Sequence, residues 1–122
     1  MLFRSALIEG DDFHPPANLA KMRAGIPLQD EDRTDWLAAL AAQLQARPAG
    51  AVLTCSALKR RYRDQLRRHV PELELVHLHG SREVIAARQA SRPGHFMPAS
   101  LLDSQFATLE PLAGDEIGRA HV

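Results

Sequence analysis

Residues 51–63 read AVLTCSALKRRYR, and this stretch decides the fold class of the chain. Its first five residues form a short, nearly continuous apolar run, which is typical of a strand covered on both faces. Ser56 is placed to cap a helix that begins near Ala57 and runs to about His69. A buried strand followed directly by a helix predicts an α/β domain with a parallel sheet.

The segments on either side continue this alternation of strands and helices. A strand is predicted over residues 6–8, which end abruptly at the acidic sequence EGDD of residues 9–12. Further helices are predicted over residues 18–24, 30–47, 82–90 and 101–109, and a further strand over residues 73–79. No strand or helix is predicted after Gly114. Ligands of such sheets bind beyond the carboxyl ends of the strands, where residues 9–11, Ser56 and Gly80 fall.

The composition excludes several classes of function. Lys plus Arg and Asp plus Glu both number 15, so the formal charge is zero and no global field attracts nucleic acid or an anionic membrane. No apolar run approaches the roughly 20 residues of a membrane helix, so we expect a soluble protein. The single cysteine, Cys55, excludes an internal disulfide and fits a reducing compartment, which favours a cytoplasmic location.

Acidic residues at the end of the first strand are the first candidate site. Glu9 and Asp11 alternate along the chain and can face one pocket, while Gly10 lets a ligand approach. One carboxylate could support Mg²⁺, directly or through water, and the other could orient or deprotonate a hydroxyl. A solvated acidic turn explains the same residues equally well.

Arg33 is the informative residue of the second candidate site. It lies in the first turn of a helix that begins with Asp30, Glu31 and Asp32. These acids favour the amino end of a helix through its dipole, whereas an arginine there opposes the dipole unless it has an anionic partner. A carboxylate ligand would be such a partner.

Basic residues form two further groups. Lys59 and Arg63 lie on one face of the helix after Ser56, and this face is explained either by solvation or by anion binding at the helix start. Arg88 and Arg92 precede a loop over residues 93–98, where a phosphate-contacting lid would place its cations. Stabilisation of the carboxyl end of the helix explains the same pair.

Metal binding and cysteine chemistry have weaker support. His77 and His79 share a strand face, but the sequence shows no third ligand at a suitable spacing, which favours a packing role. Cys55 has no neighbouring base that would make it a nucleophile, and a small buried residue at a strand end accounts for it.

Taken together, five segments resemble the gluconokinase family in residue type, spacing and order. They are residues 9–22 (EGDxxHPxxNxxKM), 25–37 (GxPLxDxDRxxWL), 55–67 (CSALKxxYRDxLR), 88–96 (RxxxRxxHF) and 102–110 (LxSQxxxLE).

The resemblance implies a P-loop kinase fold of three layers around a parallel sheet, related to shikimate and adenylate kinases. It implies ATP-dependent phosphorylation of D-gluconate to 6-phospho-D-gluconate, with Mg²⁺ arriving with the ATP, and a homodimer. Partners are therefore gluconate and ATP, with no nucleic acid and no membrane.

The resemblance also implies a role for each candidate residue. Glu9 would lie near the water shell of Mg²⁺, and Asp11 near the acceptor hydroxyl. Arg33 resembles the arginine that binds the substrate carboxylate. His14, Ser56, Lys59 and Arg63 would line the sugar-acid pocket, and Arg88 and Arg92 resemble the lid arginines that close over ATP.

One family motif is absent from these 122 residues. No glycine is followed by lysine, so the phosphate-binding sequence GxxxxGK[ST] does not occur. We therefore expect a single partial kinase domain over residues 1–122, family-like over 6–110, without the first strand, the P-loop and the carboxy-terminal elements, and inactive alone. Residues 1–5 and 115–122 are interpreted as non-native ends, derived from sequencing adaptors.

Two alternatives stay open at this point. One is a P-loop kinase for another small hydroxy acid, such as shikimate. The other is a non-catalytic module that binds a sugar acid without ATP.

Overall fold

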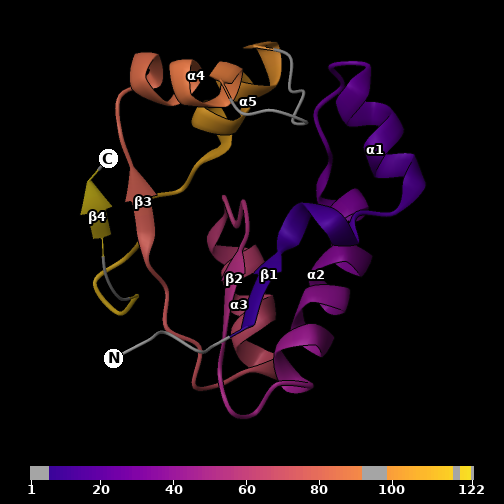
Figure 1. The fold of residues 1–122 in the computed structure, drawn as a ribbon, viewed down its shortest axis with the longest axis vertical. Coiled ribbons are helices and arrows are strands. Elements are labelled where there is room, and N and C mark those ends of the chain that lie inside the picture. Colours follow the sequence, from indigo (N-terminus) through magenta and orange to yellow (C-terminus); the bar gives the residue numbers. More distant parts are fainter. Residues whose placement is uncertain (1–5, 92–98, 117–118, 122) are drawn as a thin grey trace.

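Two short strands, β1 (Ala6–Glu9) and β2 (Ala51–Thr54), pair in parallel in the computed structural model (Figure 1). Leu7 lies opposite Val52, and both strands end at the same edge of the pair. The α/β class with parallel strand pairing is thus confirmed. The structure describes residues 6–91, 99–116 and 119–121.

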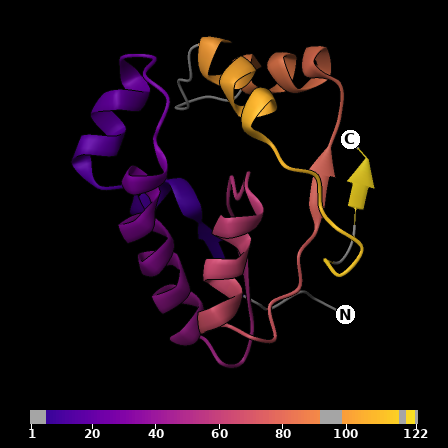
Figure 2. The same ribbon diagram turned by 180° about the vertical axis from the view of Figure 1, so that it is seen from behind.

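Helices surround this pair on one face and at its carboxyl end. These helices are α1 (Pro16–Arg23), α2 (Asp30–Gln45), α3 (Arg60–His69), α4 (Arg82–Ser91) and α5 (Ala99–Thr108), and η1 (Gly10–Phe13) is a short 3₁₀ turn. Helices α2 and α3 cover one face, while α1, α4 and α5 lie towards the end where β1 and β2 terminate (Figures 1 and 2). A second parallel pair, β3 (His77–His79) with β4 (Arg119–His121), lies apart from the first.

Local sequence explains where α1 and α2 begin and end. Pro16 occupies the first position of α1, where its missing N–H costs nothing. The chain leaves α1 through Gly25, whose φ of 75° favours glycine. At the start of α2, the backbone N–H of Gln29 donates to the Asp32 carboxylate at 2.8 Å, which satisfies a free donor of the first turn.

The core lies between α2, α3 and the covered face of β2. Its buried cluster consists of Trp36, Leu37, Leu40, Ala41, Tyr62 and Leu66, and the partly buried Leu53 and Leu58 pack against it. Full burial of a large apolar side chain, such as that of Leu37 or Leu40, contributes about 1.5–3 kcal/mol to folding.

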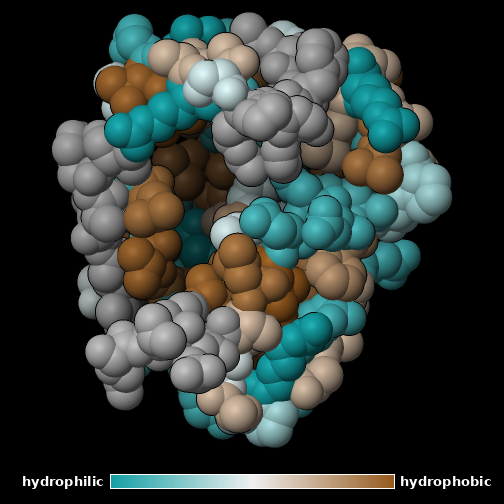
Figure 3. Space-filling model, in the orientation of Figure 1, coloured by the Kyte–Doolittle hydropathy of each residue, from teal (hydrophilic) through white to brown (hydrophobic). Residues whose placement is uncertain are grey.

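The other face of the first strand pair differs from the prediction. Leu7 is 62% exposed and Val52 is 42% exposed, so β2 is covered on one face by the described residues and not on both. The space-filling view shows hydrophobic residues around a hollow in this side of the molecule (Figure 3). The apolar run of β2 indicated burial, but period-two alternation leaves Val52 on the uncovered face.

Two predicted element boundaries were wrong. The helix expected from Ala57 begins at Arg60, because the carbonyls of Ala57 and Leu58 accept hydrogen bonds from Arg63, and Leu58 also from Glu110. Ser56 therefore caps no helix. The strand expected over residues 73–79 is limited to β3, and Leu73 packs against the core instead.

The segment after Gly114 also differs from expectation. Arg119–His121 forms strand β4, which pairs with β3 in parallel. None of the helices in the described part of the chain has the length and apolar character needed to cross a membrane.

Candidate active site

A pocket of about 210 Å³ lies at the carboxyl ends of β1 and β2. Glu9 and Thr54 come from the strand ends, and Arg33 from the first turn of α2. The volume is below the roughly 300–1,000 Å³ of drug-sized sites, so the pocket suits a small polar molecule. Its walls are completed by Asp11, His14, Met22, Pro27, Leu28, Cys55, Ser56, Gln89, Leu101, Ser104 and Gln105.

Five predicted site residues therefore meet at one pocket. They come from four parts of the chain, and the predicted position beyond the strand ends is correct. The five are Glu9, Asp11, His14, Arg33 and Ser56.

Backbone packing, rather than ligand access, requires glycine at position 10. A Cβ placed on Gly10 would lie 2.2 Å from the carbonyl oxygen of Thr54, a distance that real structures do not show. The Gly10 N–H donates to Thr54 Oγ1 at 3.3 Å, and that hydroxyl donates to Glu9 Oε2 at 3.2 Å. The end of β2 thus fixes both the acidic turn and the Glu9 carboxylate, which corrects the role predicted for Gly10.

His14 is a buried, neutral neighbour of Asp11. Its ring stacks on Trp36 with centroids 4.3 Å apart, and its Nδ1 lies 3.2 Å from Asn18 Nδ2. Asn18 Nδ2 also donates to the Asp32 carbonyl, so it is the amide nitrogen, and His14 Nδ1 accepts. The proton then sits on Nε2, 3.7 Å from Asp11 Oδ1. Burial lowers the pKa of His14, and the charge of Asp11 only partly opposes this.

Arg33 lines the pocket as a buried cation. Its side chain belongs to a residue that is only 6% exposed, and its Nε has no hydrogen-bond partner among the described residues. The guanidinium carbon lies 5.1 Å from the centre of the Tyr62 ring, whose hydroxyl donates to Asp30. The Tyr62 ring therefore makes a cation–π contact with Arg33 but accepts no hydrogen bond from its Nε. A buried cation of this kind needs an anionic partner.

Asp11 and Glu9 give the pocket acidic groups, and Arg33 gives it a cation. Burial, with a smaller contribution from the charge of Asp11, raises the pKa of Cys55 to about 12, although the charge of Arg33 acts to lower it. The same two charges act in opposite directions on His14. A ligand with an anionic end and a neutral, hydroxyl-bearing end would match this arrangement. The raised pKa also keeps the Cys55 thiol protonated, so it is no nucleophile.

Two predicted pocket residues lie elsewhere. Lys59 Nζ contacts Asp30 Oδ1 at 3.0 Å and does not line the pocket. Arg63 is 2% exposed and its guanidinium is bound by Glu116 and by backbone carbonyls, which leaves it no donor for a substrate. The prediction that Lys59 and Arg63 share one helical face was wrong, because α3 begins at Arg60 and Lys59 precedes it in an extended conformation.

The predicted lid residues are only partly described. Arg88 is exposed on α4 and does not line the pocket, whereas its neighbour Gln89 does. Arg92 and the loop over residues 93–98 lie outside the described residues. Within residues 6–91, 99–116 and 119–121, no three His, Cys, Asp or Glu side chains are grouped so as to hold a metal ion.

Sequence reasoning missed several pocket residues. Thr54 could have been found as a polar residue ending an apolar strand, a position that often carries function in parallel sheets. Ser104 and Gln105 belong to one of the five quoted segments, but helical spacing alone gave them no role. Gln89 had no sequence signal.

The fold and this pocket define an α/β domain with a polar site at the carboxyl ends of its parallel strands, and solved small-molecule kinases are similar to it. The chain is 51% identical to a solved sugar kinase from Janibacter sp. HTCC2649, with a TM-score of 0.86 over 96% of this chain and 70% of that one. A solved gluconokinase from Sinorhizobium meliloti 1021 is 50% identical, with a TM-score of 0.84 over 97% of this chain and 68% of that one. The chain belongs to the gluconokinase family.

A curated relative agrees with this assignment. The gluconokinase of Gluconobacter oxydans is 55% identical over 112 residues, which are 88% of this chain and 62% of the relative. The chain thus spans about three fifths of that protein's length. A scan against models of protein families found no match.

Proposed function

We propose that the enzyme to which this chain belongs transfers the γ-phosphoryl group of ATP to D-gluconate and forms 6-phospho-D-gluconate. The observation that carries the proposal is Arg33, a buried cation with an unpartnered Nε in a pocket that also holds Asp11. Membership of the gluconokinase family supports the same substrate.

In this proposal, Arg33 binds the carboxylate of gluconate. The guanidinium offers a fork of donors that matches a carboxylate, and its partial desolvation strengthens the pairing. Ser56, Ser104 and Gln105 supply hydroxyl and amide groups along the pocket wall, which suit a polyol chain.

Asp11 would act on the hydroxyl that accepts the phosphoryl group. It is exposed towards the pocket, and its carboxylate can hold the hydroxyl proton or orient the oxygen for in-line attack. The neutral His14 Nε2 lies 3.7 Å from Asp11 Oδ1 and borders this carboxylate without a charge of its own. Positioning and charge stabilisation would then supply most of the rate acceleration.

Magnesium fits this site as a companion of ATP rather than as a metal held by protein ligands. Among the described residues no group of three acidic or histidine side chains could hold the ion, and Glu9, which lines the pocket, would face its water shell. When bound, Mg²⁺ would neutralise charge on the phosphate oxygens. Residues Arg88 and Arg92 remain proposed contacts for the nucleotide. A cytoplasmic location and a homodimer likewise remain proposals.

The test has a binding arm and a catalytic arm. Calorimetry on the 122-residue chain measures the affinity for D-gluconate, shikimate and ATP, and we expect binding of gluconate in preference to shikimate. For catalysis, a segment of a family relative that carries the phosphate-binding sequence GxxxxGK[ST] is joined before Ala6, the carboxy terminus is completed from the same relative, and ADP release is followed with each acceptor. Turnover with shikimate but not gluconate, or with neither, would reject the proposal.

A further inference from the structure

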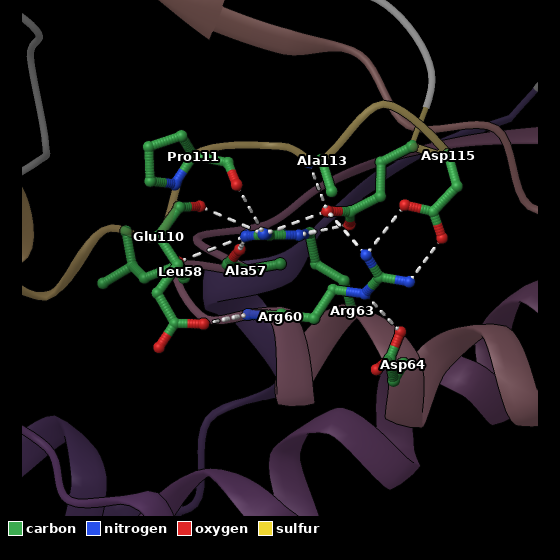
Figure 4. Close-up of polar contacts among 10 residues, drawn as sticks. Ala57, Leu58, Arg60, Arg63, Asp64, Glu110, Pro111, Ala113 and Asp115 are labelled. Atoms are coloured by element: carbon green, nitrogen blue, oxygen red, sulfur yellow. Dashed lines mark hydrogen bonds and ion pairs between the residues drawn. The ribbon is translucent and has the colours of Figure 1, made fainter.

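Arg63 joins three parts of the chain at one buried point (Figure 4). Its Nε donates to Glu116 Oε2 at 2.6 Å, and its Nη2 to Glu116 Oε1 at 3.2 Å. Its Nη1 donates to the carbonyl of Ala57 at 2.8 Å, and its Nη2 to that of Glu110 at 3.0 Å. We call these contacts the Arg63 junction.

The ion pair in this junction is fully enclosed. The side chains of Arg63 and Glu116 are 3% and 0% exposed. Burial by itself would raise the pKa of Glu116, but hydrogen bonds from Arg63 and the Ala113 N–H bring that pKa below its ordinary value. Both groups are thus charged, and removing either one would leave the other buried without a partner.

A second layer of contacts fastens the same segments together. The Glu110 N–H donates to the Leu58 carbonyl at 2.7 Å, and the Glu110 carboxylate accepts the Arg60 N–H at 2.9 Å. A carboxylate from the segment after α5 therefore caps the start of α3, where Lys59 provides no side-chain cap. On the solvent side of these contacts, the Arg60 guanidinium forms ion pairs with Asp115 and Asp64.

The segments that meet here continue into the lining of the pocket. Cys55 and Ser56 form one part of its wall and directly precede Ala57 and Leu58. Ser104 and Gln105 form another part from α5, which ends just before Glu110. The separation of these two parts depends on how the two segments are fastened together.

We propose that Arg63 is a positioning residue that sets the width of the substrate pocket by fixing the 55–58 loop against the segment after α5. It reaches no ligand itself. The identity of the ligand rests on the proposed function, whereas the positioning of the loop does not, and the two are tested separately.

Cys55 provides a reporter that needs no ligand. It is the single cysteine of the chain, lies in the 55–58 loop and is partly buried in the pocket wall. Its alkylation by iodoacetamide is measured in Arg63→Lys, which keeps the charge but loses the fork of donors, and in Glu116→Gln, which keeps the shape but loses the charge. Arg68→Lys, an exposed position on the same helix, is the matched control.

We expect the Arg63→Lys protein to be alkylated about tenfold faster than the Arg68→Lys protein, because a loop that opens locally more often exposes its thiol more often. Urea unfolding followed by circular dichroism gives the part of this increase that comes from global unfolding. The alkylation rate of Cys55 should also rise in the Glu116→Gln protein. This second variant tests the proposal if the Arg63→Lys protein does not fold. Rates equal to the control, or an increase fully explained by global unfolding, would overturn the proposal.

Calorimetry with D-gluconate gives the functional arm. The dissociation constant should rise about tenfold in Arg63→Lys and stay at the wild-type value in Arg68→Lys. Absence of gluconate binding in the wild-type chain would reject the proposed function, and the alkylation rates would still decide the role of Arg63. Faster alkylation with unchanged gluconate affinity would limit Arg63 to holding the loop and overturn its effect on pocket width.

Discussion

The indole Nε1 of Trp36 donates a hydrogen bond to the carbonyl oxygen of Gly10, 2.8 Å away. Trp36 is fully buried in α2, while Gly10 begins the turn that carries Asp11. The same indole ring stacks on His14. One core side chain therefore fixes both Asp11 and the histidine beside it, which links the stability of the core to the geometry of the pocket.

Replacing Trp36 with Phe should lower the free energy of unfolding by about 2–3 kcal/mol. The change removes part of a buried ring and leaves the Gly10 carbonyl without its donor. Because Trp36 is the only tryptophan, urea unfolding is followed by circular dichroism rather than fluorescence. An unchanged unfolding free energy would contradict the importance of this hydrogen bond.

Gly10→Ala should destabilise the protein by about 1–3 kcal/mol, because the new methyl group would lie 2.2 Å from the Thr54 carbonyl oxygen and the strand ends would have to separate. Gly114→Ala is the matched control, since its Cβ would meet no atom within 4 Å. Urea unfolding of both variants measures the difference. Equal stabilities would show that the backbones of the two strands can move apart at little cost.

Stability should fall on mild acidification because of His14. Burial lowers the pKa of this ring in the folded protein, whereas in the unfolded chain it titrates near about 6.5. Below that pH the unfolded state binds the extra proton, so the unfolding free energy decreases by up to about 1.4 kcal/mol per pH unit until the folded ring also protonates. Above that pH the ring is neutral in both states, so the contribution of His14 to the unfolding free energy does not change with pH.

The His14→Gln protein isolates this effect. Urea unfolding at intervals between pH 8 and pH 5 should give a flatter profile for the variant than for the wild type. The other histidines are the same in both proteins and cancel in the difference. Parallel profiles would mean that His14 takes up its proton in the folded state as readily as in the unfolded chain.

Arg33→Met should weaken binding of D-gluconate about 100-fold, because the substrate carboxylate would lose its buried partner. The affinity of the Arg33→Lys protein for D-gluconate should lie between those of the wild type and Arg33→Met, since lysine keeps the charge but lacks the planar fork of donors. Calorimetry measures the affinities, and Arg23→Met, an exposed arginine at the end of α1 that does not line the pocket, is the control. Full affinity in Arg33→Met would exclude Arg33 as the carboxylate site.

Much of the fold could be predicted because its signals are local. Pro16 and Gly25 mark the limits of α1, and the spacing of Trp36, Leu37 and Leu40 identifies the buried side of α2. These features depend on backbone preferences and on periodic burial within one segment. Predicted helix limits were wrong where groups outside the local segment bind backbone carbonyls. The Arg63 side chain and the Glu110 N–H do this at residues 57–58.

The pocket residues likewise divide into those that local sequence signals locate and those whose position depends on distant parts of the chain. Glu9, Asp11 and Arg33 were predicted because a strand end and a helix start locate them, and the structure brings them to one pocket. Arg63 was predicted beside them because spacing gives the face of a helix but not what that face meets. Its partner, Glu116, lies 53 positions away, in the segment that the sequence alone led us to interpret as a non-native end.

The sequence by itself indicated a parallel α/β protein that resembles the gluconokinase family, with two acids at a strand end and Arg33 at a helix start as separate candidate sites. Short-range rules suffice for this, because strand ends, helix starts and spaced motifs are properties of neighbouring residues. Only the tertiary structure decided that Gly10 serves the contact with Thr54, and that Arg63 holds the pocket wall instead of facing the pocket. Those roles depend on atoms brought together from distant segments, whose separation no local pattern specifies.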